Sequence, residues 1–176
     1  MNNLEIERKF KIKYLPDLSK VEKKEIVQHY LYKDEFTACR KRKVIDSEGV
    51  KYIYTCKCKI GAAENSVVEL EKEISEEKYI KLGEGYGNAI DKTRYIINLE
   101  NDLVAEVDIF SGIHTGICIV EVEFSSIDDA NCFVKPDWFG DEIKGKLDCN
   151  IKWSNANLAT MSKEEIEIVR NELKIK

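Results

Sequence analysis

The sequence predicts a mainly β, α+β fold: an antiparallel barrel or sandwich of about eight strands with a few covering helices. Three observations support this prediction. Charged and apolar residues alternate with a period of two along many short segments, as they do on a strand with two different faces. Turn-like stretches such as DSEG (46–49) and ENDL (100–103) separate these segments. Helical signals are confined to a few places.

The alternating segments define the expected strands. In chain order they are 4–13, 25–32, 37–45, 51–60, 66–74, 91–100, 103–110 and 116–125. Helical signals begin near Ser75 (SEEKYIKLGEG), near Asp128 and at Ser162. Ser162 and Glu165 have the spacing of a capping box at the start of SKEEIEIVRNELK. We expect these helices to cover the sheet.

Composition indicates one globular domain over residues 1–176, because 43% of the residues are hydrophobic and no linker or repeat divides the chain. The net charge of -5 argues against a general nucleic-acid binder, which relies on surplus Lys and Arg. No segment reaches the roughly 18 uncharged apolar residues of a membrane span. The stretch MNNLEIERKF carries charges where a signal peptide needs an apolar core, so we expect a cytoplasmic protein.

The cysteines do not form a zinc-site pattern. They are Cys39, Cys56, Cys58, Cys118, Cys132 and Cys149. Only Cys56 and Cys58 lie close together, at C-x-C rather than C-x-x-C spacing, and no second pair matches them. This spacing favours reduced structural thiols.

Charged residues recur two positions apart along most of the expected strands, where residues i and i+2 share a face. The sets are Glu5/Glu7/Lys9, Arg40/Arg42, Lys57/Lys59, Glu69/Glu71/Glu73, Lys92/Arg94, Glu106/Asp108 and Glu121/Glu123. The alternate positions are mostly apolar, as in Val107 and Val122. Each strand therefore has a charged face and an apolar face.

Two interpretations account for this pattern. In the first, an ordinary antiparallel sheet packs its apolar face on the core and exposes its charged face to water. However, like charges two apart on one strand repel each other, and a solvated surface gains nothing from that repetition. In the second, the face binds a ligand that contains both phosphates and metal ions. Lys and Arg suit phosphate oxygens, and carboxylates suit hard cations such as Mg²⁺ or Mn²⁺.

The charged segments resemble the CYTH superfamily, also called triphosphate tunnel metalloenzymes. Glu5-Ile6-Glu7-Arg8-Lys9 matches the E-x-E-x-K signature of that family. Further matches follow in family order: QHYL (28–31), R-x-R (40–42), T-x-K (55–57), E-x-E (69–71), KTRY (92–95), EVDIF (106–110), E-x-E (121–123) and NANLA (155–159). The resemblance covers most of the chain, and the ordered set is far more specific than any one motif.

The resemblance implies an eight-stranded antiparallel closed β-barrel, a tunnel with charged side chains inside and helices packed outside. Two positions depart from the family pattern. Val67 stands where the family commonly has Arg, and 150–153 reads NIKW in place of D-x-[RK]-Y. Lys59 and Glu73 extend their motifs on the charged face, but the family pattern does not require them.

The resemblance also implies residue roles. Bases would bind the triphosphate oxygens: Lys9, Arg40, Arg42, Lys57, Lys92, Arg94 and Lys152. Carboxylates would hold one or two Mg²⁺ or Mn²⁺ ions: Glu5, Glu7, Glu106, Asp108, Glu121 and Glu123. Glu69 and Glu71 would assist them or orient water, and Tyr30 would orient a phosphate or water. The residues expected to take part directly in catalysis are Glu5, Glu7, Lys9, Glu69 and Glu71.

The expected function is metal-dependent hydrolysis of inorganic tripolyphosphate or a nucleoside triphosphate, with water attacking the terminal phosphorus. One alternative is a class IV type adenylate cyclase, which makes cyclic AMP and pyrophosphate from ATP. Thiamine triphosphate is another candidate substrate. A non-catalytic polyphosphate or nucleotide sensor would keep the basic strands but would not need the full carboxylate set. No nucleic-acid or membrane partner is expected, and an exposed apolar patch could pair two copies as a homodimer.

Histidine chemistry is not expected. His29 adjoins Tyr30 and should face the other way, and His114 lies in the loop sequence SGIHTG. Neither has a partner at metal-ligand spacing. The sequence therefore predicts no histidine general base.

Overall fold

The computed structural model describes residues 6–59, 67–143 and 153–175, with only the backbone described at Lys59 and Val67. Glu5, Cys149 and Lys152 lie outside the described residues, as does the side chain of Lys59. The sequence-based expectations for these groups therefore stay predictions.

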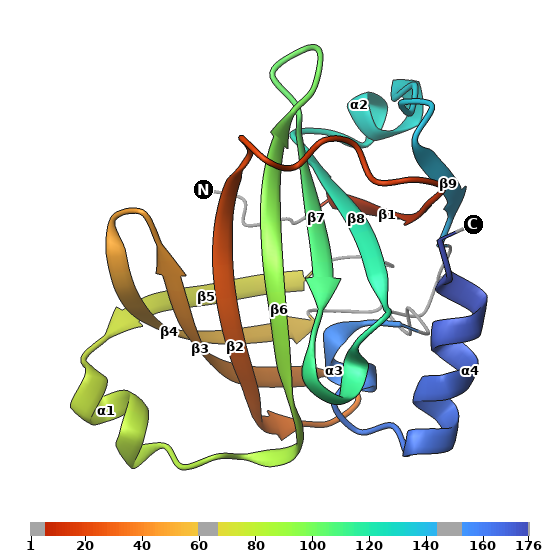
Figure 1. The fold of residues 1–176 in the computed structure, drawn as a ribbon. Helices are drawn as coiled ribbons and strands as arrows, with labels where there is room; N and C mark the ends of the chain where they lie inside the picture. The colour runs from red at the N-terminus through yellow and green to blue at the C-terminus, as the bar shows by residue number, and fades with distance from the viewer. Residues whose placement is uncertain (1–5, 60–66, 144–152, 176) are drawn as a thin grey trace.

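The structure is mainly β (Figure 1). The strands are β1 (Ile6–Ile12), β2 (Glu22–Lys33), β3 (Thr37–Asp46), β4 (Gly49–Lys59), β5 (Val67–Ile74), β6 (Tyr86–Asn98), β7 (Val104–Phe110), β8 (Cys118–Phe124) and β9 (Phe139–Glu142). The helices are α1 (Glu76–Lys81), α2 (Ile127–Cys132), α3 (Asn155–Leu158) and α4 (Lys163–Leu173), and η1 (Gly112–His114) is a short 3-10 turn. The strands expected from the sequence correspond to β1–β8, whereas β9 was not expected.

The prediction of a closed eight-stranded barrel is wrong. Nine antiparallel strands form one open sheet in the order β5-β4-β3-β2-β6-β7-β8-β1-β9. β9 pairs with β1 over Phe10–Ile12, so it occupies an edge that closure would have to use. Charged and apolar residues alternate in the same way whether the charged face lines a closed barrel or the concave side of a curved open sheet. Closure depends on a ladder between the end strands, which alternation does not reveal.

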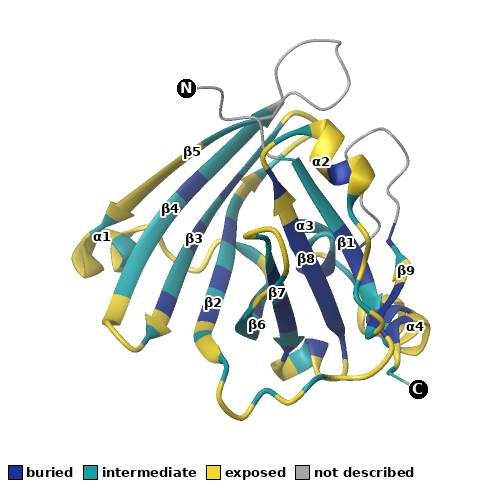
Figure 2. Ribbon diagram, turned by 90° about the horizontal axis from the view of Figure 1, so that it is seen from above, coloured by how far each residue is buried: buried dark blue, intermediate teal, exposed yellow. Residues whose placement is uncertain are grey.

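The sheet is strongly twisted, so that β3–β5 run across the direction of β6–β8 (Figure 1). Apolar clusters pack against both of its sides. On the side that carries the charged residues, one cluster joins Ile90, Phe110 and Ile119 of the sheet to Leu158 and Ile166 of the C-terminal helices. On the other side, the second cluster joins β1, β7, β8 and β9 to the α2 region. Figure 2 shows the inner strand β8 almost entirely buried, while β5, at an edge of the sheet, is much more exposed.

Helix α4 begins at the predicted capping box. Glu165 N donates to Ser162 Oγ and Ser162 N donates to Glu165 Oε2, so both reciprocal bonds are present. The helix buries Ile166, Val169 and Leu173 on one face. In the described part of the chain, no helix combines the length and apolar character that crossing a membrane requires.

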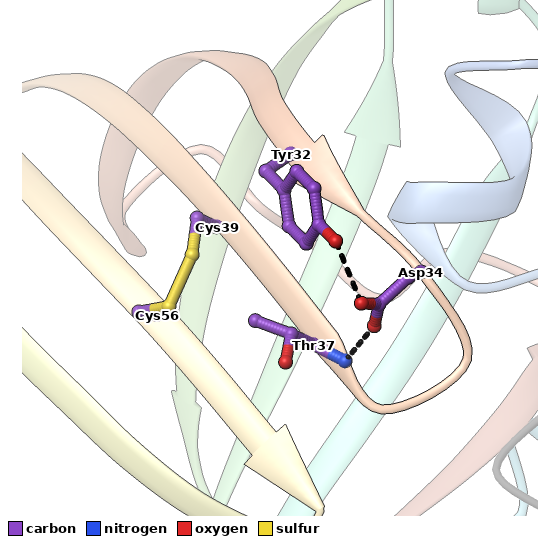
Figure 3. The surroundings of a disulfide bond; sticks show 5 residues. All are labelled: Tyr32, Asp34, Thr37, Cys39 and Cys56. Atoms are coloured by element: carbon purple, nitrogen blue, oxygen red, sulfur yellow. Dashed lines mark hydrogen bonds between the residues drawn. A yellow bond between two sulfur atoms is a disulfide. The ribbon is translucent and has the colours of Figure 1, made fainter.

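A disulfide joins Cys39 on β3 to Cys56 on β4 (Figure 3). The two residues are register partners, and their Cα atoms lie 4.2 Å apart. The prediction that all the cysteines are reduced is therefore wrong for this pair. Cys56 and Cys58 are close in sequence, but the register of β3 and β4 places Cys56 opposite Cys39. The adjoining β2–β3 turn is closed by Asp34, which accepts hydrogen bonds from Tyr32 Oη and Thr37 N (Figure 3).

Candidate functional site

The charged faces of the strands surround a cavity of about 510 Å³. It is lined by Glu7, Lys9, Gln28, Arg40, Arg42, Lys57, Glu69, Glu71, Lys92, Arg94, Glu106, Glu121, Glu123 and Asn155. All of these side chains are charged or carry an amide. Those from strands share the concave side of the sheet, opposite the apolar cluster that contains Val107 and Val120. The cluster that contains Phe110 and Ile119 packs on the same side as the cavity, since these residues pair with Lys92 and Asp108.

Most of the side chains predicted from the sequence lie in this lining, but two of the described ones do not. Asp108 is 1% exposed and lies behind the cavity wall against Lys92 and Arg94. Tyr30 is 3% exposed, and its Oη accepts a hydrogen bond of 2.9 Å from Gln28 Nε2. Both therefore act on the cavity through neighbouring side chains.

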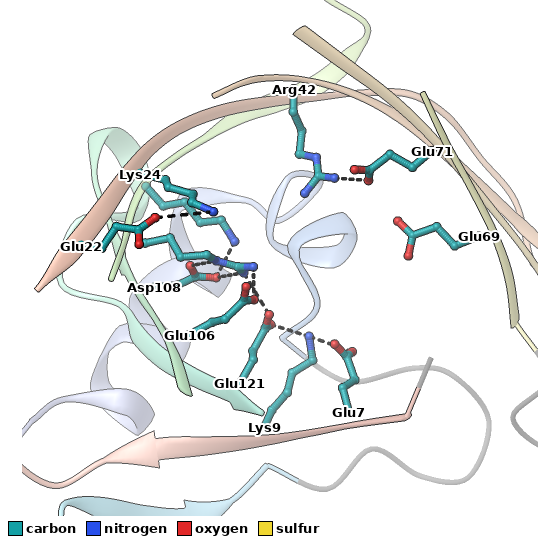
Figure 4. Close-up of polar contacts among 12 residues, drawn as sticks. Glu7, Lys9, Glu22, Lys24, Arg42, Glu69, Glu71, Glu106, Asp108 and Glu121 are labelled. Atoms are coloured by element: carbon teal, nitrogen blue, oxygen red, sulfur yellow. Dashed lines mark hydrogen bonds and ion pairs between the residues drawn. The ribbon is translucent and has the colours of Figure 1, made fainter. Parts of the chain in front are cut away.

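Lys9 lies between two carboxylates (Figure 4). Its Nζ is 2.5 Å from Glu121 Oε1 and 3.1 Å from Glu7 Oε1. The register of β1 and β8 causes this arrangement, because Lys9 pairs with Glu121 and Glu7 with Glu123. Two like charges on β8 thus face mixed charges on β1.

Arg94 is the centre of the other ion pairs on this side of the cavity. Its Nε and Nη2 donate to the two oxygens of Asp108 at 2.7 Å each, and Nη2 also reaches Glu121 Oε2 at 3.0 Å. Its Nη1 donates to Glu106, and Lys92 Nζ donates to Asp108 Oδ2. The planar guanidinium suits such two-point contacts, which fix its orientation.

The opposite side of the cavity has its own ion pairs, formed across β4. Arg40 Nη2 lies 3.4 Å and Lys57 Nζ 3.3 Å from the carboxylate of Glu69. Arg42 donates to Glu71, and both contact the hydroxyl of Thr55 between them. Each like-charged pair on one strand is therefore matched by opposite charges on a strand nearby.

The ion pairs set the protonation states. Burial alone would lower the pKa of Lys9, but Glu121 and Glu7 outweigh it and raise the pKa. Burial would raise the pKa of Glu121, but Lys9 and Arg94 hold that pKa well below its usual value. Burial, reinforced by Arg94, lowers the pKa of Lys92 to about 8.

Gln28 and Asn155 line the cavity although no role was predicted for either. Both lie in motifs that the sequence displays, QHYL and NANLA. Gln28 is 1% exposed and is the register partner of Arg42, so its side chain shares the inward face. Asn155 is the first residue of α3 and supplies the helical part of the described lining. Because both side chains are neutral, they do not belong to the pattern of charged residues two positions apart.

The carboxylates of the cavity are engaged by basic side chains. Among the residues that the structure describes, no group of three or more His, Cys, Asp or Glu is arranged to hold a metal ion. Glu7, Glu106 and Glu121 instead accept from Lys9 and Arg94. Their chemistry still fits a hard cation, because Glu7, Glu106, Glu121 and Glu123 supply only oxygen donors from three neighbouring strands.

Known proteins resemble this chain in sequence and structure. No family model matches it. An inorganic triphosphatase of Nitrosomonas europaea is 33% identical over 141 residues, which cover 79% of this chain and 88% of that protein. The crystal structure of the inorganic triphosphatase NE1496 superposes with a TM-score of 0.62 at 31% identity, over 90% of this chain and 95% of that one.

A more distant structure supports the fold alone. The PH1819 protein from Pyrococcus horikoshii OT3 gives a TM-score of 0.52 at 19% identity, covering 98% of this chain and 91% of that one.

Proposed function

Because this chain belongs to the CYTH superfamily of triphosphate tunnel metalloenzymes, we propose that it is a triphosphatase that hydrolyses inorganic triphosphate with a divalent cation. The observation that carries the proposal is the cavity itself. Basic side chains from β1, β3, β4 and β6 converge on a space lined by charged and amide groups. A triphosphate presents oxygens along its whole length, so it can engage several of these donors at once.

The substrate would exchange partners with the resident ion pairs. Lys9 and Arg94 now donate to Glu121, and Arg40 and Arg42 donate to Glu69 and Glu71. Phosphate oxygens can accept the same hydrogen bonds, and in doing so they release carboxylate oxygens into the cavity. The bases neutralise charge that would otherwise repel an attacking water.

The released carboxylates would then hold the cation, with Glu7, Glu106, Glu121 and Glu123 as its ligands. A Mg²⁺ or Mn²⁺ ion bound there would withdraw charge from the phosphates and lower the pKa of water. Asp108 holds Lys92 and Arg94 in place through both carboxylate oxygens, and we assign it that role in preference to metal binding. Glu69 and Glu71 lie on the opposite side, where they orient the bases or water.

Water attack on the terminal phosphorus breaks the outer phosphoanhydride bond. The products are orthophosphate and diphosphate, and the proton leaves with the solvent or a phosphate oxygen. The described lining contains no aromatic or aliphatic side chain on which a purine or thiamine ring could stack. This composition favours inorganic triphosphate over ATP, and it gives the cyclase reaction no adenosine pocket.

The test is product analysis with purified protein. Inorganic triphosphate, ATP and thiamine triphosphate are each incubated with Mg²⁺, Mn²⁺ or EDTA, and products are separated by chromatography. We expect cation-dependent release of orthophosphate, fastest from inorganic triphosphate. Lys9→Met should abolish it, whereas Lys23→Met, at an exposed lysine of β2, should not. Cyclic AMP from ATP, or no hydrolysis of any substrate by the wild type, would reject the proposal.

A further inference from the structure

His114 lies outside the cavity and is completely buried. It ends the η1 turn between β7 and β8, and its ring meets Phe110 edge-on at a centroid distance of 6.3 Å. Phe110 in turn contacts the cavity lysine, because Lys92 Nζ lies 5.6 Å from the Phe110 ring centroid. A buried titratable ring is thus packed directly behind the cavity wall.

The imidazole makes one hydrogen bond, and its geometry identifies the tautomer. Nε2 lies 3.0 Å from the carbonyl oxygen of Leu158, which can only accept, so Nε2 carries the proton. Nδ1 is buried and has no hydrogen-bond partner in the described part of the chain. The neutral ring therefore fits the site, and a second proton on Nδ1 would be buried without an acceptor.

The carbonyl that His114 holds belongs to α3, the helix that brings Asn155 to the cavity. α3 has only four residues, so it cannot hold its own position. Further bonds to its C-terminal part come from Asn88 N to Ala159 O at 2.7 Å and from Lys33 Nζ to Asn157 Oδ1 at 2.5 Å. Among these anchors, His114 provides an imidazole, the side chain whose ordinary pKa lies nearest to neutral pH.

We propose that His114 is a positioning residue: in its neutral form it seats α3 so that the Asn155 amide faces the bound triphosphate. This inference rests on the proposed function, since it assigns a new role in the same site. Protonation of His114 or loss of its donor would displace α3 and weaken substrate binding. The bases on the strands would stay in place, so the chemical step would change little.

The surroundings of His114 decide its response to pH. Burial lowers the pKa of His114, the Leu158 carbonyl and Asp91 of β6 act in the opposite direction, and Arg170 of α4 lowers it further. The ring is therefore neutral above its usual pKa, and it becomes charged only at more acidic pH. Its support for α3 is complete at neutral pH and is lost as the pH falls through the lowered value.

The test is a double-mutant cycle between His114→Phe and Asn155→Ala, followed by steady-state kinetics with inorganic triphosphate. Phe keeps the ring packing and removes the donor. We expect each variant to raise KM by about tenfold, the effect of one lost hydrogen bond, with little change in kcat. The double variant should be no worse than Asn155→Ala alone. His29→Phe, at the other histidine of the chain, should have the KM of the wild type.

An unchanged KM in His114→Phe, or two effects that multiply to about a hundredfold, would overturn the proposal. If His114→Phe does not fold, the pH dependence of KM provides the test. Acidification should raise the KM of the wild type but not that of Asn155→Ala. An equal pH dependence of KM in the two proteins would overturn the proposal. If the wild type does not hydrolyse triphosphate, the proposed function fails. In that case the Kd for sodium triphosphate, measured by calorimetry, replaces KM in the comparisons between the variants and between pH values.

Discussion

Replacing Asp108 by Asn tests how the cavity holds its bases. Asp108 is 1% exposed, and its two oxygens accept three hydrogen bonds from Arg94 and Lys92. Asn has nearly the same shape but no charge, and one of its two terminal atoms is a donor. The variant therefore leaves two buried cations without their shared counter-ion, and the NH₂ group points at one of them.

Removing one partner of a buried ion pair typically destabilises a protein by about 3–5 kcal/mol. Here the loss should lie near the lower limit, because Lys92 can release its proton. Its pKa is already lowered to about 8, and Asp108 is one of the groups that keep it from falling further. For a domain of this size, a loss of about 3 kcal/mol lowers Tm by roughly 6–12 °C.

The sign of the pH dependence follows from the same pKa. The pKa of Lys92 is lower in the folded wild type than in the unfolded chain, and Asp108→Asn lowers the folded value further. Between the folded and unfolded pKa values of Lys92, the unfolded chain binds more protons than the folded protein, so stability falls as the pH falls. This range extends to lower pH in the variant than in the wild type. The difference in Tm between wild type and variant should be smallest at alkaline pH, where only the contacts of Arg94 are lost, and should widen as the pH falls below about 8.

The assay is thermal unfolding followed by circular dichroism from pH 5 to pH 9. Asp141→Asn, at an exposed aspartate of β9, serves as the control. A variant that melts within about 2 °C of the wild type at pH 6, or a constant difference across this range, would refute the reasoning. The Mn²⁺ concentration for half-maximal activity should stay the same, whereas it would rise if Asp108 were a metal ligand.

Peptide mapping under non-reducing conditions should recover a linked peptide that contains Cys39 and Cys56; two separately alkylated peptides would instead support reduced thiols. Gly87→Ala should lower Tm and raise KM for triphosphate, because its new Cβ would lie 2.4 Å from Ala159 O, beside α3. Gly83→Ala is the control, since Gly83 also has positive φ but its Cβ would meet nothing within 4 Å. Equal effects of the two substitutions would show that backbone strain alone is responsible.

Alternation predicted most strands because it is a local property. β7 shows why: Ala105 and Val107 are fully buried in the apolar cluster, while Glu106, between them, faces the cavity. The extra strand β9 lies in FGDE (139–142), which is too short for an alternation signal. The alternation also could not predict that the sheet is open, because closure depends on whether the two edge strands pair with each other.

The candidate site was predictable as a set of residues but not as a set of contacts. The spacing of Arg40 and Arg42 places both on one face of a strand, whichever strands pair with it. It does not show that Glu69 and Glu71 reach them across an intervening strand, since that depends on the register of β3, β4 and β5. In the same way, EVDIF suggested a ligand at Asp108, whereas the register with Arg94 turns that carboxylate toward the bases. His114 could not be linked to Leu158, because 44 residues separate them.

The charge balance of the cavity gives a physical reason for requiring a cation. The described lining contains six basic side chains, Lys9, Arg40, Arg42, Lys57, Lys92 and Arg94, and six carboxylates, Glu7, Glu69, Glu71, Glu106, Glu121 and Glu123. A bare triphosphate therefore meets a lining without net positive charge, and it must displace carboxylates that then repel it. A divalent cation that enters with the substrate takes over those carboxylates, so every group that loses a partner gains a new one. Binding of triphosphate should thus weaken sharply in EDTA, even though six basic side chains of the described residues line the cavity.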